Sequence, residues 1–279
     1  MKRTTDSASI HSLTRQLRAL VEPILGVVFQ APEARAGALG LDPLAWYMAG
    51  RAAALGPVRP AAAAAVFATF NPALVERALT GVWDRVAIDA VLDARLASAC
   101  RLLERVVGHD ESRLARANEL LRPISTAGQV FGAPLYAGLK SLEWPQSEVG
   151  ILWRCCDLIR EHRGDVHNAA WRAAGLDPVE INVLSEAWRG VEYGTVSVKQ
   201  MGWSHGAMGR ALERLESAEL IKDGVITTAG RALREDIELT TSLQQTELAE
   251  SSGGCAGELF ELITPWAEQC SKSAVTYWE

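Results

Sequence analysis

The chain of 279 residues is 48% hydrophobic and 22% charged, which is typical of a globular protein and excludes a disordered one. No apolar run approaches the ~20 residues that a membrane span needs, and the polar opening lacks the apolar core of a signal peptide, so we expect a cytoplasmic protein without membrane contacts. The net charge of -6 argues against a surface built throughout for nucleic acid.

The first part of the chain predicts a series of helices. A helical pattern begins at Ser12, Pro32 suits the first position of a short second helix, and Asp42 and Asn71 each precede a proline, as N-caps often do. Pro123 is expected to separate two later helices. The helices predicted after Pro32 cover residues 44–55, 73–79, 88–107, 111–121 and 124–142, and one more begins at Pro145.

The stretch from Trp153 to Trp171 carries many ionisable groups between apolar ones. Gly164 predicts the end of a helix and Asp165 the N-cap of the next. Such a corner is expected to bring together His162, Arg163, Asp165 and His167. The alternative is that the charged residues here are solvated and that Asp165 only caps a helix.

Gly175-Leu-Asp-Pro178 predicts a domain boundary, because the pattern changes after it. Residues 1–175 show no strand alternation and predict an all-helical domain, which we expect to hold a ligand pocket. Residues 176–250 predict a winged helix-turn-helix domain with a minimal β-hairpin. Its expected parts are helix 179–188, short helix 195–200, a helix capped by Ser204, a hairpin turning at Asp223-Gly224, and a helix 229–247 capped by Thr228. Residues 251–279 predict a C-terminal helix that packs back on the first domain or on a partner. The fold class is therefore mainly α.

Five segments resemble one known family: residues 29–36, 48–57, 70–75, 158–165 and 228–238. The chain resembles, over nearly its whole length, actinobacterial proteins of about this size labelled helix-turn-helix or MarR-like, most of them uncharacterised. That family continues the motif around His162 with a glycine before the second histidine, whereas Val166 precedes His167 here. The resemblance implies a winged helix and, by its label, DNA binding.

The first functional hypothesis is a ligand-responsive MarR-like regulator that binds DNA through Ser204–Leu215. Recognition needs basic or amide side chains on the exposed face of this helix and phosphate contacts nearby. The candidate residues are His205, Arg210, Arg214 and, in the wing, Lys222. Glu213 and Glu216 oppose them, so we expect DNA binding to be weak and the winged helix to be degenerate.

The second hypothesis, which we favour, is a small-molecule pocket in the helical domain. Its candidate ligand-binding residues are Glu33, Trp46, Tyr47, Arg51, Phe70, Trp153, Arg163 and Trp171. Its candidate catalytic residues are His162, Asp165 and His167, with a histidine as acid or base and an arginine holding an anion. The alternative is that the aromatic residues are only core.

Motifs for bound cofactors are missing from the sequence. It contains no phosphate-binding glycine loop, dinucleotide fingerprint or His-Glu-x-x-His zinc motif, and adjacent Cys155 and Cys156 project about 100° apart on a helix, which suits chelation poorly. We therefore expect no cofactor, no metal and free thiols. A cofactor-free lyase or cyclase of actinobacterial secondary metabolism, or a binding protein, fits best, either one forming homo- or hetero-oligomers through the winged helix or the C-terminal helix.

Overall fold

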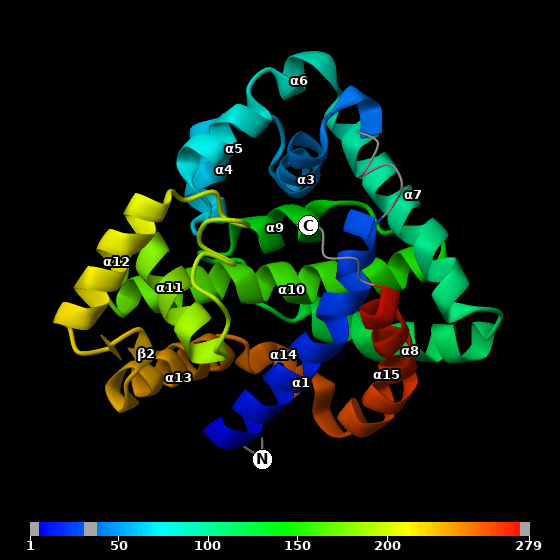
Figure 1. Cartoon of the computed structure of the whole chain (residues 1–279). Coiled ribbons are helices and arrows are strands. Elements are labelled where there is room, and N and C mark those ends of the chain that lie inside the picture. Colours follow the sequence, from blue (N-terminus) through cyan, green and yellow to red (C-terminus); the bar gives the residue numbers. More distant parts are fainter. Residues whose placement is uncertain (1–5, 31–37, 274–279) are drawn as a thin grey trace.

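The computed structural model of the protein describes residues 6–30 and 38–273. Within them the chain is mostly helical, and its only strands form one antiparallel hairpin, which confirms the predicted mainly α fold (Figure 1). The α-helices are α1 Ser7–Gly26, α3 Pro43–Ala52, α4 Pro60–Phe67, α5 Pro72–Leu79, α6 Val82–Arg85, α7 Ile88–Val107, α8 Glu111–Thr126, α9 Pro134–Ser141, α10 Glu148–Ala173, α11 Pro178–Arg189, α12 His205–Ser217, α13 Thr228–Leu243, α14 Thr246–Ser252 and α15 Ala256–Ser273. None of the described helices is long and apolar enough to span a membrane.

The two Asx-Pro signals start helices as predicted. The Asp42 carboxylate accepts hydrogen bonds from the backbone N–H groups of Leu44 and Ala45, both at 2.9 Å, and begins α3. The Asn71 side chain accepts from the N–H of Ala73 at 3.0 Å and begins α5. Each proline occupies a first-turn position that needs no donor. The short helix expected at Pro32 lies outside the described residues.

Helices α1 and α8 each contain an internal proline, and neither ends at it. α1 starts earlier than Ser12, with Asp6 as its N-cap, and passes through Pro23. The predicted break at Pro123 is wrong, because α8 continues to Thr126. Pro123 lies on the exposed side of the last turn, where water can solvate the carbonyl that loses its partner. α9 then begins at Pro134.

The central helix α10 contradicts the expected corner. It begins after its N-cap Ser147, rather than at Pro145, and runs without a break through Gly164 to Ala173. In Figure 1 it crosses the middle of the molecule, with α3 and α9 above it and α13 and α14 below. A glycine in a helix interior costs roughly 1 kcal/mol relative to alanine. Burial of α10 against α1, α8, α9 and α13 outweighs that cost.

The winged helix is built from α11, α12, the hairpin and α13. Strands β1 Ile221–Lys222 and β2 Val225–Ile226 flank the predicted Asp-Gly turn. Two boundaries differ from prediction: Thr227 rather than Thr228 caps α13, and α13 ends at Leu243. The expected short helix at 195–200 is instead a run of turns. A buried carboxylate holds this run, as the backbone N–H groups of Gly194, Val196 and Ser197 all donate to Glu186 at 2.6–3.0 Å.

Helix α1, near the start of the chain, packs against α13 and α15, near its end. α13 packs against both α10 and α1, so the winged helix shares an extensive boundary with the preceding helices. α15 packs against α1 and α8, and the core there includes Trp153 and Trp266. The five cysteines are free thiols, and burial raises the pKa of Cys155 to about 12.

We predict that Glu186→Gln weakens the fold by about 2–3 kcal/mol, because an amide nitrogen cannot accept from the backbone N–H groups that Glu186 satisfies. Urea unfolding followed by circular dichroism measures the change. Glu192→Gln, at an exposed position of the same segment, is the control and is expected to change stability by less than about 0.5 kcal/mol. Equal stability of Glu186→Gln and the wild type would show that the carboxylate does not organise these turns.

Candidate functional site

A cavity of about 190 Å³ lies where α10 meets α1, α3 and α13. It thus adjoins both the N-terminal helices and the winged helix. Its lining is rich in arginine and comprises Arg18, Glu22, Tyr47, Arg51, Phe67, Thr69, Phe70, Leu135, Arg160, Arg163, Gly164, His167, Asn168, Met201, Arg234 and Glu238.

One face of α10 forms a wall of the cavity. Its lining residues are Arg160, Arg163, Gly164, His167 and Asn168. These positions follow the spacing of three, four and seven residues that places side chains on one side of a helix. Gly164 leaves room here, because a Cβ added to it would meet only Glu161 Oε2, at 3.7 Å. The uninterrupted helix, rather than a corner, therefore aligns these groups.

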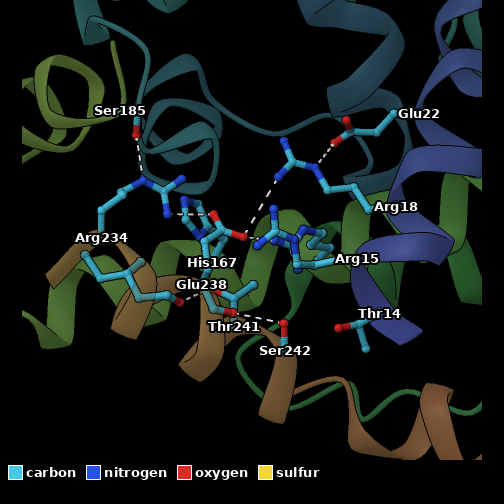
Figure 2. Close-up of polar contacts among 12 residues, drawn as sticks. Thr14, Arg15, Arg18, Glu22, His167, Ser185, Arg234, Glu238, Thr241 and Ser242 are labelled. Atoms are coloured by element: carbon cyan, nitrogen blue, oxygen red, sulfur yellow. Dashed lines mark hydrogen bonds and ion pairs between the residues drawn. The ribbon is translucent and has the colours of Figure 1, made fainter. Parts of the chain in front are cut away.

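Glu238 of α13 is the centre of a buried ionic cluster. Its carboxylate pairs with Arg163 of α10 and with Arg234 Nη1 at 2.6 Å, while Arg18 Nη1 of α1 approaches to 3.9 Å. Figure 2 shows Arg18 and Arg234 reaching this carboxylate from opposite sides. Burial alone would raise the pKa of Glu238, but the charges of Arg234 and Arg163 lower it to about 2. Glu238 is therefore ionised at neutral pH.

A second ionic cluster surrounds Glu161 on the neighbouring side of α10. Arg51 of α3 donates to both Glu161 oxygens, from Nε at 3.0 Å and Nη2 at 2.9 Å, and Arg160 Nη1 donates at 2.7 Å. Burial opposes ionisation of Glu161, yet Arg160 and Arg51 lower its pKa to about 2. The Arg51 guanidinium also lies 4.7 Å from the centre of the Phe67 ring, which fixes its orientation in the wall.

His167 contributes a neutral imidazole to the cavity. Thr241 donates its hydroxyl proton to the carbonyl of Ile237 at 2.7 Å, so its oxygen accepts from His167 Nδ1 at 3.0 Å. This assignment leaves the lone pair on Nε2. Burial, reinforced by the charge of Arg234, lowers the pKa of His167 to about 3. The ring is therefore a hydrogen-bond acceptor or base rather than a cation.

His162 and Asp165 lie away from the cavity. The His162 ring packs edge-on against Tyr136 at 4.8 Å between centroids. Asp165 accepts from the backbone N–H of Tyr136 at 3.0 Å, so it caps α9 across the interface rather than starting a new helix. Burial raises the pKa of Asp165 to about 7. The structure thus separates these two candidates from His167 and Arg163.

Some of the candidate ligand-binding residues line the cavity, and others belong to the core. Tyr47, Arg51, Phe70 and Arg163 line the cavity. Trp46, Trp153 and Trp171 are at most 2% exposed and belong to the core. Glu33 lies outside the described residues.

Four further lining residues were not predicted from the sequence: Arg18, Arg160, Arg234 and Glu238. Three of them belong to pairs that the sequence does show, because Arg18 precedes Glu22 by four residues on a helix and Arg234 precedes Glu238 by four. Exposed ion pairs have the same spacing, so it does not distinguish a cavity wall from a solvated face.

The candidate DNA-binding face has few available cations. Arg214 is held by Asp177 at 2.5 Å and Glu180 at 2.6 Å. His205, Arg210 and Lys222 are exposed, but Glu213 and Glu216 share α12 with the first two, and Asp223 follows Lys222 in the turn. Within the described part of the chain, no group of acidic, histidine or cysteine residues is arranged to hold a metal ion.

The chain matches a family of known proteins. A family model described as a helix-turn-helix family matches residues 14–276. This match spans most of the chain, so the protein belongs to that helix-turn-helix family, as its motifs suggested. No curated protein and no solved structure matches the chain.

We predict that Asp165→Asn stabilises the protein increasingly as the pH rises. The folded pKa of Asp165 is raised to about 7, so the wild type loses stability between its unfolded value, near 4, and pH 7 as the buried carboxyl ionises. Asparagine keeps an oxygen for the Tyr136 N–H and carries no charge. The difference in melting temperature between variant and wild type should be near zero around pH 4 and reach the equivalent of a few kcal/mol at about pH 8.

The matched variant for this test is Asp165→Ala, which removes the acceptor and should be destabilising by about 1 kcal/mol at low pH. A difference between Asp165→Asn and the wild type that does not vary with pH would contradict the raised pKa.

Proposed function

We propose that this member of the helix-turn-helix family binds a small organic molecule in the cavity between its N-terminal helices and its winged helix. The observation that carries the proposal is the lining itself, in which arginines from α1, α3, α10 and α13 converge on one space with a neutral histidine. Buried charged groups are costly to maintain and concentrate at binding sites. The aromatic rings of Tyr47 and Phe70 supply an apolar contact beside them.

The size of the cavity restricts the ligand. About 190 Å³ corresponds to the liquid volume of roughly six water molecules, so a metabolite of about ten non-hydrogen atoms or fewer fits without movement of the walls. A larger molecule would have to extend out of the cavity toward solvent.

The cavity also supports the proposal of a cofactor-free lyase or cyclase. His167 Nε2 has the free lone pair that a general base needs, and a bound anion beside the ring would raise the pKa of His167 from its value of about 3 toward the range in which a base works well. Arg51 and Arg163 would hold an anionic substrate or stabilise a developing negative charge. Of the three candidate catalytic residues, we assign acid–base chemistry to His167, because His162 and Asp165 do not line the cavity.

The second candidate function is a ligand-responsive regulator of the MarR-like type, and the family match favours it. An actinobacterial origin, which the resemblance of the chain's motifs implies, and a place in secondary metabolism are part of this proposal. The electrostatics oppose DNA binding, since Arg214 is already paired and the exposed part of α12 retains only His205 and Arg210 as cationic or titratable donors. We therefore rank ligand binding without strong DNA binding first.

We predict that a panel of acidic, neutral and basic metabolites with about ten non-hydrogen atoms or fewer contains members that raise the melting temperature. The same metabolites should raise the melting temperature of the Gly164→Leu variant much less, because the new leucine side chain occupies part of the cavity. Leucine is a good helix former and the position has open space, so this variant should fold. Thermal shift and calorimetry measure the effect.

Gly26→Leu is the control for this experiment, because Gly26 is also helical with nothing within 4 Å of an added Cβ and does not line the cavity. Ligands that stabilise wild type, Gly26→Leu and Gly164→Leu equally would bind elsewhere and would refute the proposed site.

We predict weak binding to duplex DNA, in the micromolar range or worse at physiological salt, because affinity for phosphates needs clustered basic residues. Fluorescence anisotropy with a labelled random duplex measures it. Submicromolar, strongly salt-dependent binding that Arg210→Ala abolishes would instead support the regulator.

A further inference from the structure

The charges around the cavity fall into two groups, one around Glu161 and one around Glu238. The Glu161 cluster contains Arg51, Arg160 and Glu161, and its two guanidinium groups face one carboxylate. Guanidinium groups stay protonated in proteins, and the low pKa of Glu161 keeps its carboxylate charged. Among these three groups one positive charge is in excess, and Asp165 nearby, with its pKa raised to about 7 by burial, offsets only part of it at neutral pH.

The Glu238 cluster has the same imbalance. It contains three guanidinium groups, those of Arg18, Arg163 and Arg234, against the carboxylates of Glu22 and Glu238. His167 beside it is neutral and does not alter the balance. One positive charge is again in excess, separately from the Glu161 cluster.

Each cluster also holds an arginine with donors to spare. Arg160 donates Nη1 to Glu161, and Arg18 donates Nε to Glu22 while its Nη1 lies 3.9 Å from Glu238, so each guanidinium has N–H groups that make no hydrogen bond to the described residues. The side chains of Arg160 and Arg18 are 29% and 39% exposed, whereas the other arginines of the clusters are at most 8% exposed. These two are therefore placed at the accessible rim, where they can meet a ligand.

The two accessible arginines belong to different helices and to different glutamates. Arg160 of α10 pairs with Glu161, and Arg18 of α1 lies near Glu238. One anionic group beside each arginine would balance both clusters, and a molecule with an anionic group at each end would supply both.

We propose that the ligand of this cavity is a small molecule with two separate anionic groups, a dicarboxylate in its simplest form, one group for each cluster. This inference rests on the proposed function and specifies its ligand class. Each carboxylate would accept from an arginine that already shares a glutamate, so the ligand completes the charge balance without displacing Glu161 or Glu238.

The test uses three probes of nearly equal size that differ in charge: succinate, succinamate and succinamide. Calorimetry at neutral pH and low salt measures the affinity of the wild-type protein for each. We expect succinate to bind at least about tenfold more tightly than succinamate, and succinamide to bind most weakly, because each neutral amide leaves one cluster unbalanced. Inorganic phosphate, which carries its charge on one centre, should bind less tightly than succinate.

Two variants locate the charges. Arg160→Gln and Arg18→Gln each remove the excess charge of one cluster at a partly exposed position, so the buried glutamates keep their other arginines. Each variant should lose at least about tenfold in succinate affinity and should no longer prefer succinate to succinamate. Arg77→Gln, at an exposed arginine of α5 outside the cavity, is the control and should bind as the wild type does.

The outcomes separate this inference from the proposed function. Succinamide binding as tightly as succinate, or succinate binding unchanged by both variants, would overturn the two-anion ligand. Phosphate binding more tightly than succinate would also overturn it in favour of a single compact anion. If no dicarboxylate binds but other metabolites act through the Gly164→Leu-sensitive site, the inference fails and the proposed function stands. If no metabolite acts through that site, both fail.

Discussion

The carboxylate of Glu238 is the constraint on which the arrangement of α1, α10 and α13 depends. It is 1% exposed, and a charge so buried is tolerated only when paired. Its partners come from α10 and from its own helix, and Arg18 of α1 lies near. The pairing therefore joins the winged helix to the helices that precede it in the chain. Removing one partner of a buried pair typically costs about 3–5 kcal/mol, since the remaining charge stays buried.

Local signals in the sequence predicted much of the fold. N-caps followed by proline predicted the helix starts at Asp42 and Asn71, and helical periodicity predicted α7. The Asp-Gly turn predicted the hairpin. Pro123 was misjudged because a proline's effect depends on where in the helix its freed carbonyl lies. The 195–200 segment was misjudged because its backbone donors bind a glutamate in another element. Such tertiary contacts override local propensity.

The candidate site was predicted in part, for a related reason. A glycine can end a helix, or it can lie inside a helix at a position where space is needed. The sequence around Gly164 does not distinguish these two cases, whereas the packing around α10 does. Arg51, Arg163 and His167 were selected by residue type and do line one cavity. Arg18, Arg160 and Arg234 were not, because an arginine in a buried cluster and one on a solvated face look alike in sequence. Their positions depend on contacts between distant segments.

The distribution of charge within the winged helix bears on its use. Its outward helix α12 carries Arg214, which neighbouring carboxylates already hold, whereas the inward side of α13 carries Arg234 and Glu238, both at most 5% exposed. A DNA-binding module keeps its cations on the face that meets phosphate. Here Arg234, the buried arginine of α13, is directed toward α10 and the cavity. This arrangement favours a winged helix that serves as a wall of the cavity, since a fold alone does not fix a function.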